Sequence, residues 1–138
     1  WTGFVESGNA WVEDGALRVT GPLEQLVLLS HQVALGLRAD GSLVRIDPEG
    51  TSAVVGVTSL GDEAPRLESA RRCGEGLCLS YPGAAAIGWW SSSGELLERV
   101  GVSGLWPEER VAQATMDASG GVYVLISSPT GTRLAWAP

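Results

Sequence analysis

Short apolar segments separated by turn residues recur along the whole chain, and two long stretches of this pattern superimpose without a gap. Residues 33–59 can be laid on residues 77–103, 44 positions later, so that Leu35 falls on Leu79 and Gly50 on Gly94. Each stretch alternates between apolar runs and turns rich in Gly, Asp, Ser and Pro. A repeat of this length built from short strands is typical of a propeller blade.

Each full repeat contains four predicted strands, because apolar alternation is interrupted by turn residues at regular intervals. The predicted strands are 26–29, 33–37, 43–47 and 52–57 in one repeat, then 67–71, 77–81, 86–90 and 96–102 in the next. A third copy begins at 111–114 and 122–126 and ends at 134–136. Before the first full repeat, residues 1–5 and 10–19 indicate a third and a fourth strand, the latter bent at Gly15. No helix is predicted.

This pattern predicts an all-β fold, a propeller-type array of four-stranded antiparallel blades. Its parts are a partial blade at 1–22, full blades at 23–66 and 67–110, and a partial blade at 111–138. Closed propellers have roughly four to eight blades, so about three blades form an open array or one completed by another chain. The end faces would then be bare, and we expect assembly edges at Phe4, Trp11, Leu134 and Trp136.

Composition and charge restrict the possible partners. Nine Arg and Lys oppose sixteen Asp and Glu, giving a net charge of −7, which argues against nucleic acid and anionic membranes. No apolar stretch approaches the roughly 20 residues needed to span a bilayer. No leader sequence precedes Trp1, so we expect a mature product or a segment of a longer chain.

Cys73 and Cys78 are the two cysteines, and they flank a predicted turn between two strands. We expect them to face each other across this hairpin within reach of a disulfide, although two buried free thiols remain an alternative. A metal or redox role is less suited to the spacing, because no second pair of ligands exists. A disulfide implies an oxidising compartment, which favours an extracellular, cell-surface or periplasmic location.

The six tryptophans suggest a possible ligand surface, because an indole ring can stack on the apolar face of a sugar and donate a hydrogen bond. Trp89 and Trp90 point to opposite faces of one strand, and we expect Trp90 to pack between blades. Trp136 is expected to repeat this core role, which Ile46 fills in the first full blade. Trp89 and Trp106 are the candidates for exposed binding residues.

Other candidate chemistry is better explained by ordinary turns. His31 lies in a predicted turn, and no serine has the surroundings of a nucleophile elbow. The acidic turns at 40–41, 47–49 and 62–63 lack the ligand spacing of known calcium loops. Asp40, Asp47 and Asp117 could serve as propeller carboxylates, but they fall in turns at different strand levels. We therefore expect no catalytic residue, no metal and no cofactor.

Residues 39–50 (ADGSLVRIDPEG) and 117–124 (DASGGVYV) resemble the blades of secreted bacterial β-propellers with NHL-type or quinoprotein-like repeats. In such blades a similar motif marks the hairpin of the second and third strands. The WD dipeptide of WD40 blades is absent. The resemblance implies a scaffold, and it does not imply a particular activity.

Two classes of function fit this scaffold. The first is a non-catalytic extracellular or cell-surface module for protein binding or self-assembly, whose partner is another chain or the remainder of a longer one. A glycan is a further possible ligand, as in a lectin-like propeller. The second class is a fragment of a propeller hydrolase or lyase. The repeat, the expected disulfide and the missing catalytic set favour the first.

Overall fold

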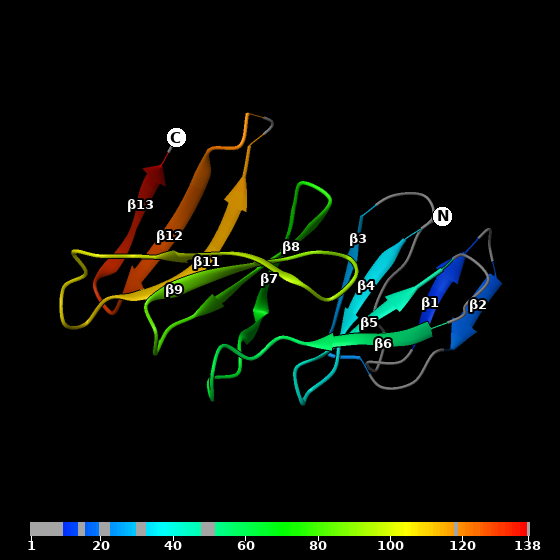
Figure 1. Ribbon diagram of the computed structural model, residues 1–138. Coiled ribbons are helices and arrows are strands. Elements are labelled where there is room, and N and C mark those ends of the chain that lie inside the picture. Colours follow the sequence, from blue (N-terminus) through cyan, green and yellow to red (C-terminus); the bar gives the residue numbers. More distant parts are fainter. Residues whose placement is uncertain are drawn as a thin grey trace.

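The computed structural model of the chain describes residues 10–13, 16–19, 23–29, 33–47, 52–117 and 119–137. Within these residues every regular element is a β-strand, and all strand pairs are antiparallel. The expected all-β array of four-stranded blades is confirmed, and no sheet closes on itself. Figure 1 shows the sheets following one another in sequence order, with the C-terminal strand β13 far from β1 and β2.

Two sheets contain four strands each, in simple meander order. Sheet A consists of β3 (Gln25–Leu28), β4 (Ala34–Leu37), β5 (Ser42–Ile46) and β6 (Ser52–Val57). Sheet B consists of β7 (Arg66–Cys73), β8 (Gly76–Tyr81), β9 (Ala86–Trp90) and β10 (Leu96–Gly101). The turn glycines Gly41 and Gly94 have φ values of 86° and 87°, which a residue with a Cβ rarely adopts.

Sheet C has three strands, β11 (Arg110–Met116), β12 (Val122–Ser128) and β13 (Gly131–Ala137). Its first strand, β11, lies against β7 and β8 of sheet B, and β3 of sheet A also lies against β7. The first strands of the three sheets are therefore neighbours, as the inner strands of propeller blades are.

The N-terminal part differs from the predicted single bent strand at 10–19. The backbone forms two strands, β1 (Ala10–Glu13) and β2 (Ala16–Val19), which pair with each other in a hairpin. The sequence between them is Asp14-Gly15, and Asp-Gly favours tight hairpin turns. The strand predicted at 1–5 lies outside the described residues, as does Phe4.

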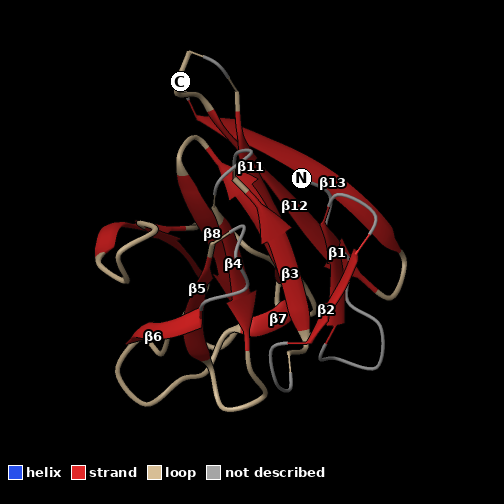
Figure 2. Cartoon of the chain, turned by 90° about the vertical axis from the view of Figure 1, so that its right-hand side faces the viewer, coloured by secondary structure: helices blue, strands red, loops and turns tan. Residues whose placement is uncertain are grey.

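Figure 2 shows the described residues as strands and loops alone. Buried side chains between facing sheets form the core. Between sheets A and B, Leu35 and Leu37 meet Leu79, Tyr81 and other buried side chains. A second cluster, which includes Ile87, Val111, Val124 and Ile126, fills the space between sheets B and C. A third cluster lies on the other face of sheet A and contains Leu23, Ala34, Val44 and Ile46. Strands β4 and β8 are buried on both faces, and side chains of opposite faces enter different clusters.

Two further contacts hold sheets A and B at a fixed distance. The Tyr81 hydroxyl accepts a hydrogen bond from Trp90 Nε1 at 2.9 Å and donates one to the Thr58 carbonyl oxygen. All three residues are buried, so both hydrogen bonds are shielded from water. The turn at Gly94 also touches the backbone of β6, since a Cβ placed at Gly94 would fall on the Val55 carbonyl oxygen.

The face pairing departs from the gapless repeat. Shifting the cross-strand pair Leu37–Leu43 by 44 residues places Tyr81 opposite Ile87, but the structure pairs Tyr81 with Ala86. The segment between Tyr81 and Ala86 in sheet B is therefore one residue shorter than the segment between Leu37 and Leu43 in sheet A. Because successive side chains of a strand point to opposite faces, this difference turns β8 over relative to β4. Leu35 consequently faces sheet B, whereas Leu79 faces sheet A.

Candidate functional site

One face of sheet C is packed and the other is open. Val124 and Ile126 of β12 point toward sheet B and are buried. Strand register places a different set on the opposite face, which we call the open face: Gln113, Thr115, Tyr123, Leu125, Leu134 and Trp136. On this face Leu134 is 64% exposed and Trp136 is 56% exposed, although both side chains are large and apolar.

The open face carries a shallow groove of about 350 Å³ beside the inner strand of sheet B. Leu125 and Leu134 form part of its apolar wall, and Arg71 of β7 lies at its border. The Tyr123 and Trp136 rings lie side by side on the same face, with their centroids 6.1 Å apart. The groove and the two rings make a continuous surface of the kind that packs against a neighbouring blade.

Strand β13 adds a second unpaired surface. It pairs with β12, and among the described residues no fourth strand lies beside it in sheet C, whereas sheets A and B each have four strands. The outer edge of β13 therefore presents backbone N–H and C=O groups that another strand could pair with. Open face and free edge meet along the same strand.

The structure exposes Leu134 and Trp136, which were expected at an assembly edge, and their role in assembly stays a prediction. The expected core role of Trp136 is wrong. Trp90 and Ile46 are buried at 5% and 0% exposure, but Trp136 pairs with Tyr123 on the open face. The position that packs toward sheet B belongs to Ala135. Trp11 lies in β1, and the placement of its side chain is outside the described part of the structure.

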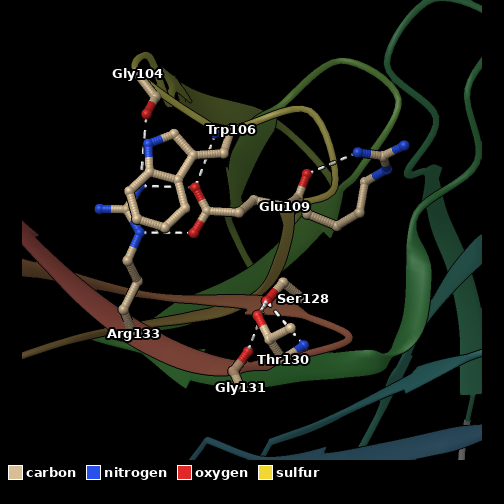
Figure 3. A network of polar contacts seen from close by, with 8 residues as sticks. Gly104, Trp106, Glu109, Ser128, Thr130, Gly131 and Arg133 are labelled. Atoms are coloured by element: carbon tan, nitrogen blue, oxygen red, sulfur yellow. Dashed lines mark hydrogen bonds and ion pairs between the residues drawn. The ribbon is translucent and has the colours of Figure 1, made fainter.

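Trp106, a predicted binding residue, is 61% exposed and lies in the connection between β10 and β11. Its backbone N–H donates a hydrogen bond to Glu109 Oε1 at 2.8 Å. Glu109 also accepts bonds from Nε and Nη2 of Arg133, at 2.7 and 2.8 Å, in the bidentate geometry of a strong ion pair (Figure 3). The Arg133 guanidinium lies 5.1 Å from the centroid of the Trp106 ring.

The electrostatics of this cluster fix Glu109 as a carboxylate. Glu109 is only 4% exposed, but the hydrogen bonds from Arg133, with that from the Trp106 amide, lower its pKa to about 2. The hydrogen bonds to Glu109 in turn raise the pKa of Arg133. The ion pair of Glu109 and Arg133 could not be predicted from the sequence, because the two residues are 24 positions apart in the chain. The one local signal is a glutamate three residues after the start of a turn, a spacing that lets its side chain reach back to the turn amide.

Trp89, the other predicted binding residue, is half-buried rather than exposed. Its ring packs against the core between sheets B and C, and its Nε1–H donates to the Cys73 carbonyl oxygen at 3.1 Å. The donor that a ligand would use is therefore already engaged within the β7–β8 hairpin. Trp89 and Trp106 do not form a common site.

Cys73 and Cys78 form a disulfide, with their Cα atoms 5.7 Å apart. They do not face each other directly as expected. Cys73 pairs with Gly76, and Cys78 pairs with Arg71, so the two cysteines are diagonal neighbours on one face of the hairpin. Both side chains belong to the core between sheets B and C. The disulfide indicates an oxidising, non-cytoplasmic compartment.

Among the candidate acidic residues, Asp40 and Asp117 bond to the backbones of their own turns, whereas Glu63 accepts the amides of Gly83 and Ala84 at 2.7 and 2.8 Å. Asp117 Oδ1 accepts bonds from the Ser119 hydroxyl and from the amides of Ser119 and Gly121, and these bonds lower the pKa of Asp117. Bonds from the side chain and amide of Ser42 likewise lower the pKa of Asp40. Asp47 directly follows β5, and the rest of its predicted turn lies outside the described residues. His31 lies outside the described residues.

Two features are absent from the described residues. They contain no group of three or more His, Cys, Asp or Glu side chains arranged to hold a metal ion. They also contain no helix with the length and apolar character needed to cross a membrane.

Comparison with known proteins identifies the architecture and no family. No family profile matches the sequence, and no curated protein matches it either. Among solved structures, the chain is similar to regucalcin from Agrobacterium tumefaciens, described as a calcium-binding protein and a β-propeller, with a TM-score of 0.59 and 13% identity. The chain has a propeller-like fold. The match covers 91% of this chain and 45% of regucalcin, so the chain spans less than half the length of that propeller.

Proposed function

We propose that this chain is a non-catalytic assembly module of a propeller outside the cytoplasm. Further blades, from a second chain or from the remainder of a longer one, would cover the open face of sheet C. The observation that carries this proposal is the exposure of Leu134 and Trp136 on one face of a propeller sheet. Covering such side chains stabilises a structure by about 1.5–3 kcal/mol each when burial is complete.

The free edge of β13 supports the same conclusion. A fourth strand added to β13 would complete sheet C to the four strands of sheets A and B. Pairing would also satisfy the backbone groups that an edge strand leaves open to aggregation. The chain matches 45% of a single-chain propeller, so an equal amount of additional structure is expected in a closed ring.

The chemistry of the described residues gives no support to a catalytic role. The pKa values of Asp40 and Asp117 are lowered by turn hydrogen bonds, which hold both carboxylates in the ionised form. Regucalcin is named for calcium binding, but the described residues of this chain contain no group of three or more His, Cys, Asp or Glu side chains that could hold a metal ion. Secretion by a bacterium, and kinship with NHL-type or quinoprotein-like blades, stay predictions.

The proposal is tested by replacing the apolar side chains of the open face with charges. We expect the wild-type chain to associate as its concentration rises in sedimentation velocity, because the open face is covered by a second copy when its natural neighbour is missing. A variant with Leu134→Lys and Trp136→Lys should remain monomeric over the same range. The proposal is wrong if the wild-type chain is monomeric throughout and the variant is no more soluble.

A matched control separates this face from general surface hydrophobicity. Val54 on β6 is 53% exposed, so it resembles Leu134 in exposure but lies on an outer strand of sheet A. The Val54→Lys variant should associate as the wild type does. Equal effects of Val54→Lys and of the sheet C variant would show that association does not depend on the open face.

A further inference from the structure

A second surface lies on the side of sheet C opposite the open face. Arg133 pairs with the buried Ile126, whereas Leu134 pairs with Leu125 of the open face, so the two neighbours on β13 point in opposite directions. The Arg133 side chain extends to the connection that carries Trp106 (Figure 3). This surface is separate from the one proposed for assembly.

The Trp106 ring is exposed and yet held in place. The Glu109 carboxylate accepts hydrogen bonds from the Trp106 backbone amide and from Nε and Nη2 of Arg133. Arg133 Nη2 also donates to the Gly104 carbonyl oxygen at 3.5 Å. These contacts fix the loop backbone and place the guanidinium over one face of the indole. Because the ring is 61% exposed, its remaining surface faces solvent. A rigid, solvent-facing indole loses little conformational freedom when it binds a flat ligand.

Hydroxyl groups line a groove beside this ring. A groove of about 180 Å³ is lined by Trp106, Glu109, Arg133 and the β12–β13 hairpin with Ser128, Thr130 and Thr132. The Ser128 and Thr130 hydroxyls lie 3.1 Å apart and bond to each other. The Ser128 hydroxyl also donates to the Gly131 carbonyl oxygen and accepts from the Thr130 amide, so its bonding capacity is used within the hairpin. The Thr130 hydroxyl donates to Ser128 and keeps two acceptor sites for a ligand. Pockets for drug-sized molecules hold roughly 300–1,000 Å³, so this groove fits a single small ring with the rest of the ligand in solvent.

The charge balance of the groove selects a neutral ligand. Glu109 and Arg133 neutralise each other in a bidentate pair, and the remaining lining groups are hydroxyls, backbone and an indole. Neither a phosphate nor a cation would find an uncompensated charge here. An indole next to hydroxyls offers a flat apolar surface and hydrogen-bonding partners, which match a sugar ring with its apolar C–H face and its equatorial hydroxyls.

We infer that the groove at Trp106 binds a neutral carbohydrate, with one pyranose ring stacked on the exposed surface of the Trp106 indole. The Thr130 hydroxyl then accepts a hydrogen bond from a hydroxyl at the edge of the sugar, and Ser128 holds the Thr130 side chain in place. Glu109 and Arg133 are positioning residues that hold the indole. Binding of a single ring in so shallow a groove is weak, in the millimolar range, and gains strength from repeated presentation in an assembled propeller.

The test follows the tryptophan indole N–H signals of the nitrogen-15-labelled chain by NMR during titration. The probes are the methyl glycosides of glucose, galactose and mannose, together with N-acetylglucosamine, and glucose 6-phosphate serves as an anionic comparison. We expect at least one neutral sugar to shift the Trp106 signal in a saturable manner. Trp106→Ala, followed through the backbone amide signals of the β12–β13 hairpin, should weaken binding of that sugar at least about tenfold. Trp136→Ala should leave binding unchanged by the same signals.

Trp136 is a suitable control because it is similarly exposed, at 56%, on the opposite side of the same sheet. Thr130→Val keeps the shape of the side chain and removes its hydroxyl, so it should weaken binding severalfold in a folded protein. The inference is overturned if no neutral sugar shifts the Trp106 signal, if Trp136→Ala weakens binding as much as Trp106→Ala, or if glucose 6-phosphate binds more tightly than the neutral sugars.

Discussion

Removing one buried hydroxyl should loosen the contact between sheets A and B. Tyr81 is fully buried, and its hydroxyl connects Trp90 Nε1 of sheet B to the Thr58 carbonyl oxygen at the end of sheet A. Tyr81→Phe keeps the ring and its packing but leaves a buried donor and a buried acceptor without partners. Each unsatisfied buried group costs roughly 1–3 kcal/mol, and two are left, so we expect a loss of at least about 2 kcal/mol in the free energy of unfolding.

Urea unfolding followed by far-ultraviolet circular dichroism measures this loss. With a denaturant dependence of about 2 kcal/mol per molar urea, the midpoint should fall by at least about 1 M. Tyr123→Phe is the matched control, because Tyr123 is partly exposed and bonds to the partly exposed Asp117, so water can replace its hydroxyl contacts. The reasoning is refuted if Tyr81→Phe lowers the midpoint no more than Tyr123→Phe does.

Three further predictions follow from the described contacts. Because the folded-state pKa of Glu109 is about 2, below its usual 4.5, its stabilising effect is present above pH 4.5 and is lost as the pH falls toward 2; Glu109→Gln should therefore be less stable near neutrality, and the difference from wild type should shrink over this range in thermal melts. Replacing Cys73 and Cys78 with serine should lower stability by about 2 kcal/mol, as measured in urea, and intact mass after alkylation of the unfolded wild type should show no added alkyl group. Gly94→Ala should cost at least about 2 kcal/mol in the same assay, because a Cβ is strained at a φ of 87° and also meets the Val55 carbonyl oxygen.

Matched variants decide these cases. Glu98→Gln removes a glutamate from an exposed position of β10 and serves as the matched control for Glu109→Gln. Gly101→Ala adds a methyl group where nothing lies within 4 Å and should be nearly neutral, while Gly104→Ala tests a φ of 77° in open space. If Gly94→Ala lowers the free energy of unfolding no more than Gly104→Ala does, the turn at Gly94 is not in close contact with β6.

Local sequence signals predicted most of the strands. The strand ranges of sheets A and B lie within about two residues of those predicted, because glycine turns such as Asp40-Gly41 and Ser93-Gly94 fix where each hairpin reverses. The hairpin of β1 and β2 was missed although Asp14-Gly15 carries the same signal. The repeat led to that error, since it assigned these residues to one strand.

The gapless repeat could not predict which face each side chain occupies. One residue fewer in the β8–β9 connection is invisible among turn residues, yet it turns β8 over relative to β4. Trp136 was placed in the core because its sequence position resembles that of Trp90, but the register of β13 puts it beside Tyr123 on the open face. The ion pair of Glu109 and Arg133 was not predictable either, because it joins a loop to a distant strand and depends on how sheet C folds back.

Hydrogen exchange at β13 tests the proposed assembly most directly. In an edge strand, alternate backbone amides point away from the neighbouring strand and exchange freely. The proposal predicts that the β13 amides pointing away from β12 become protected as the chain concentration rises, together with the side of sheet C that carries Leu134 and Trp136. If these amides exchange at unprotected rates at every concentration while the inner strands remain protected, no further strand or blade covers sheet C, and the account is contradicted.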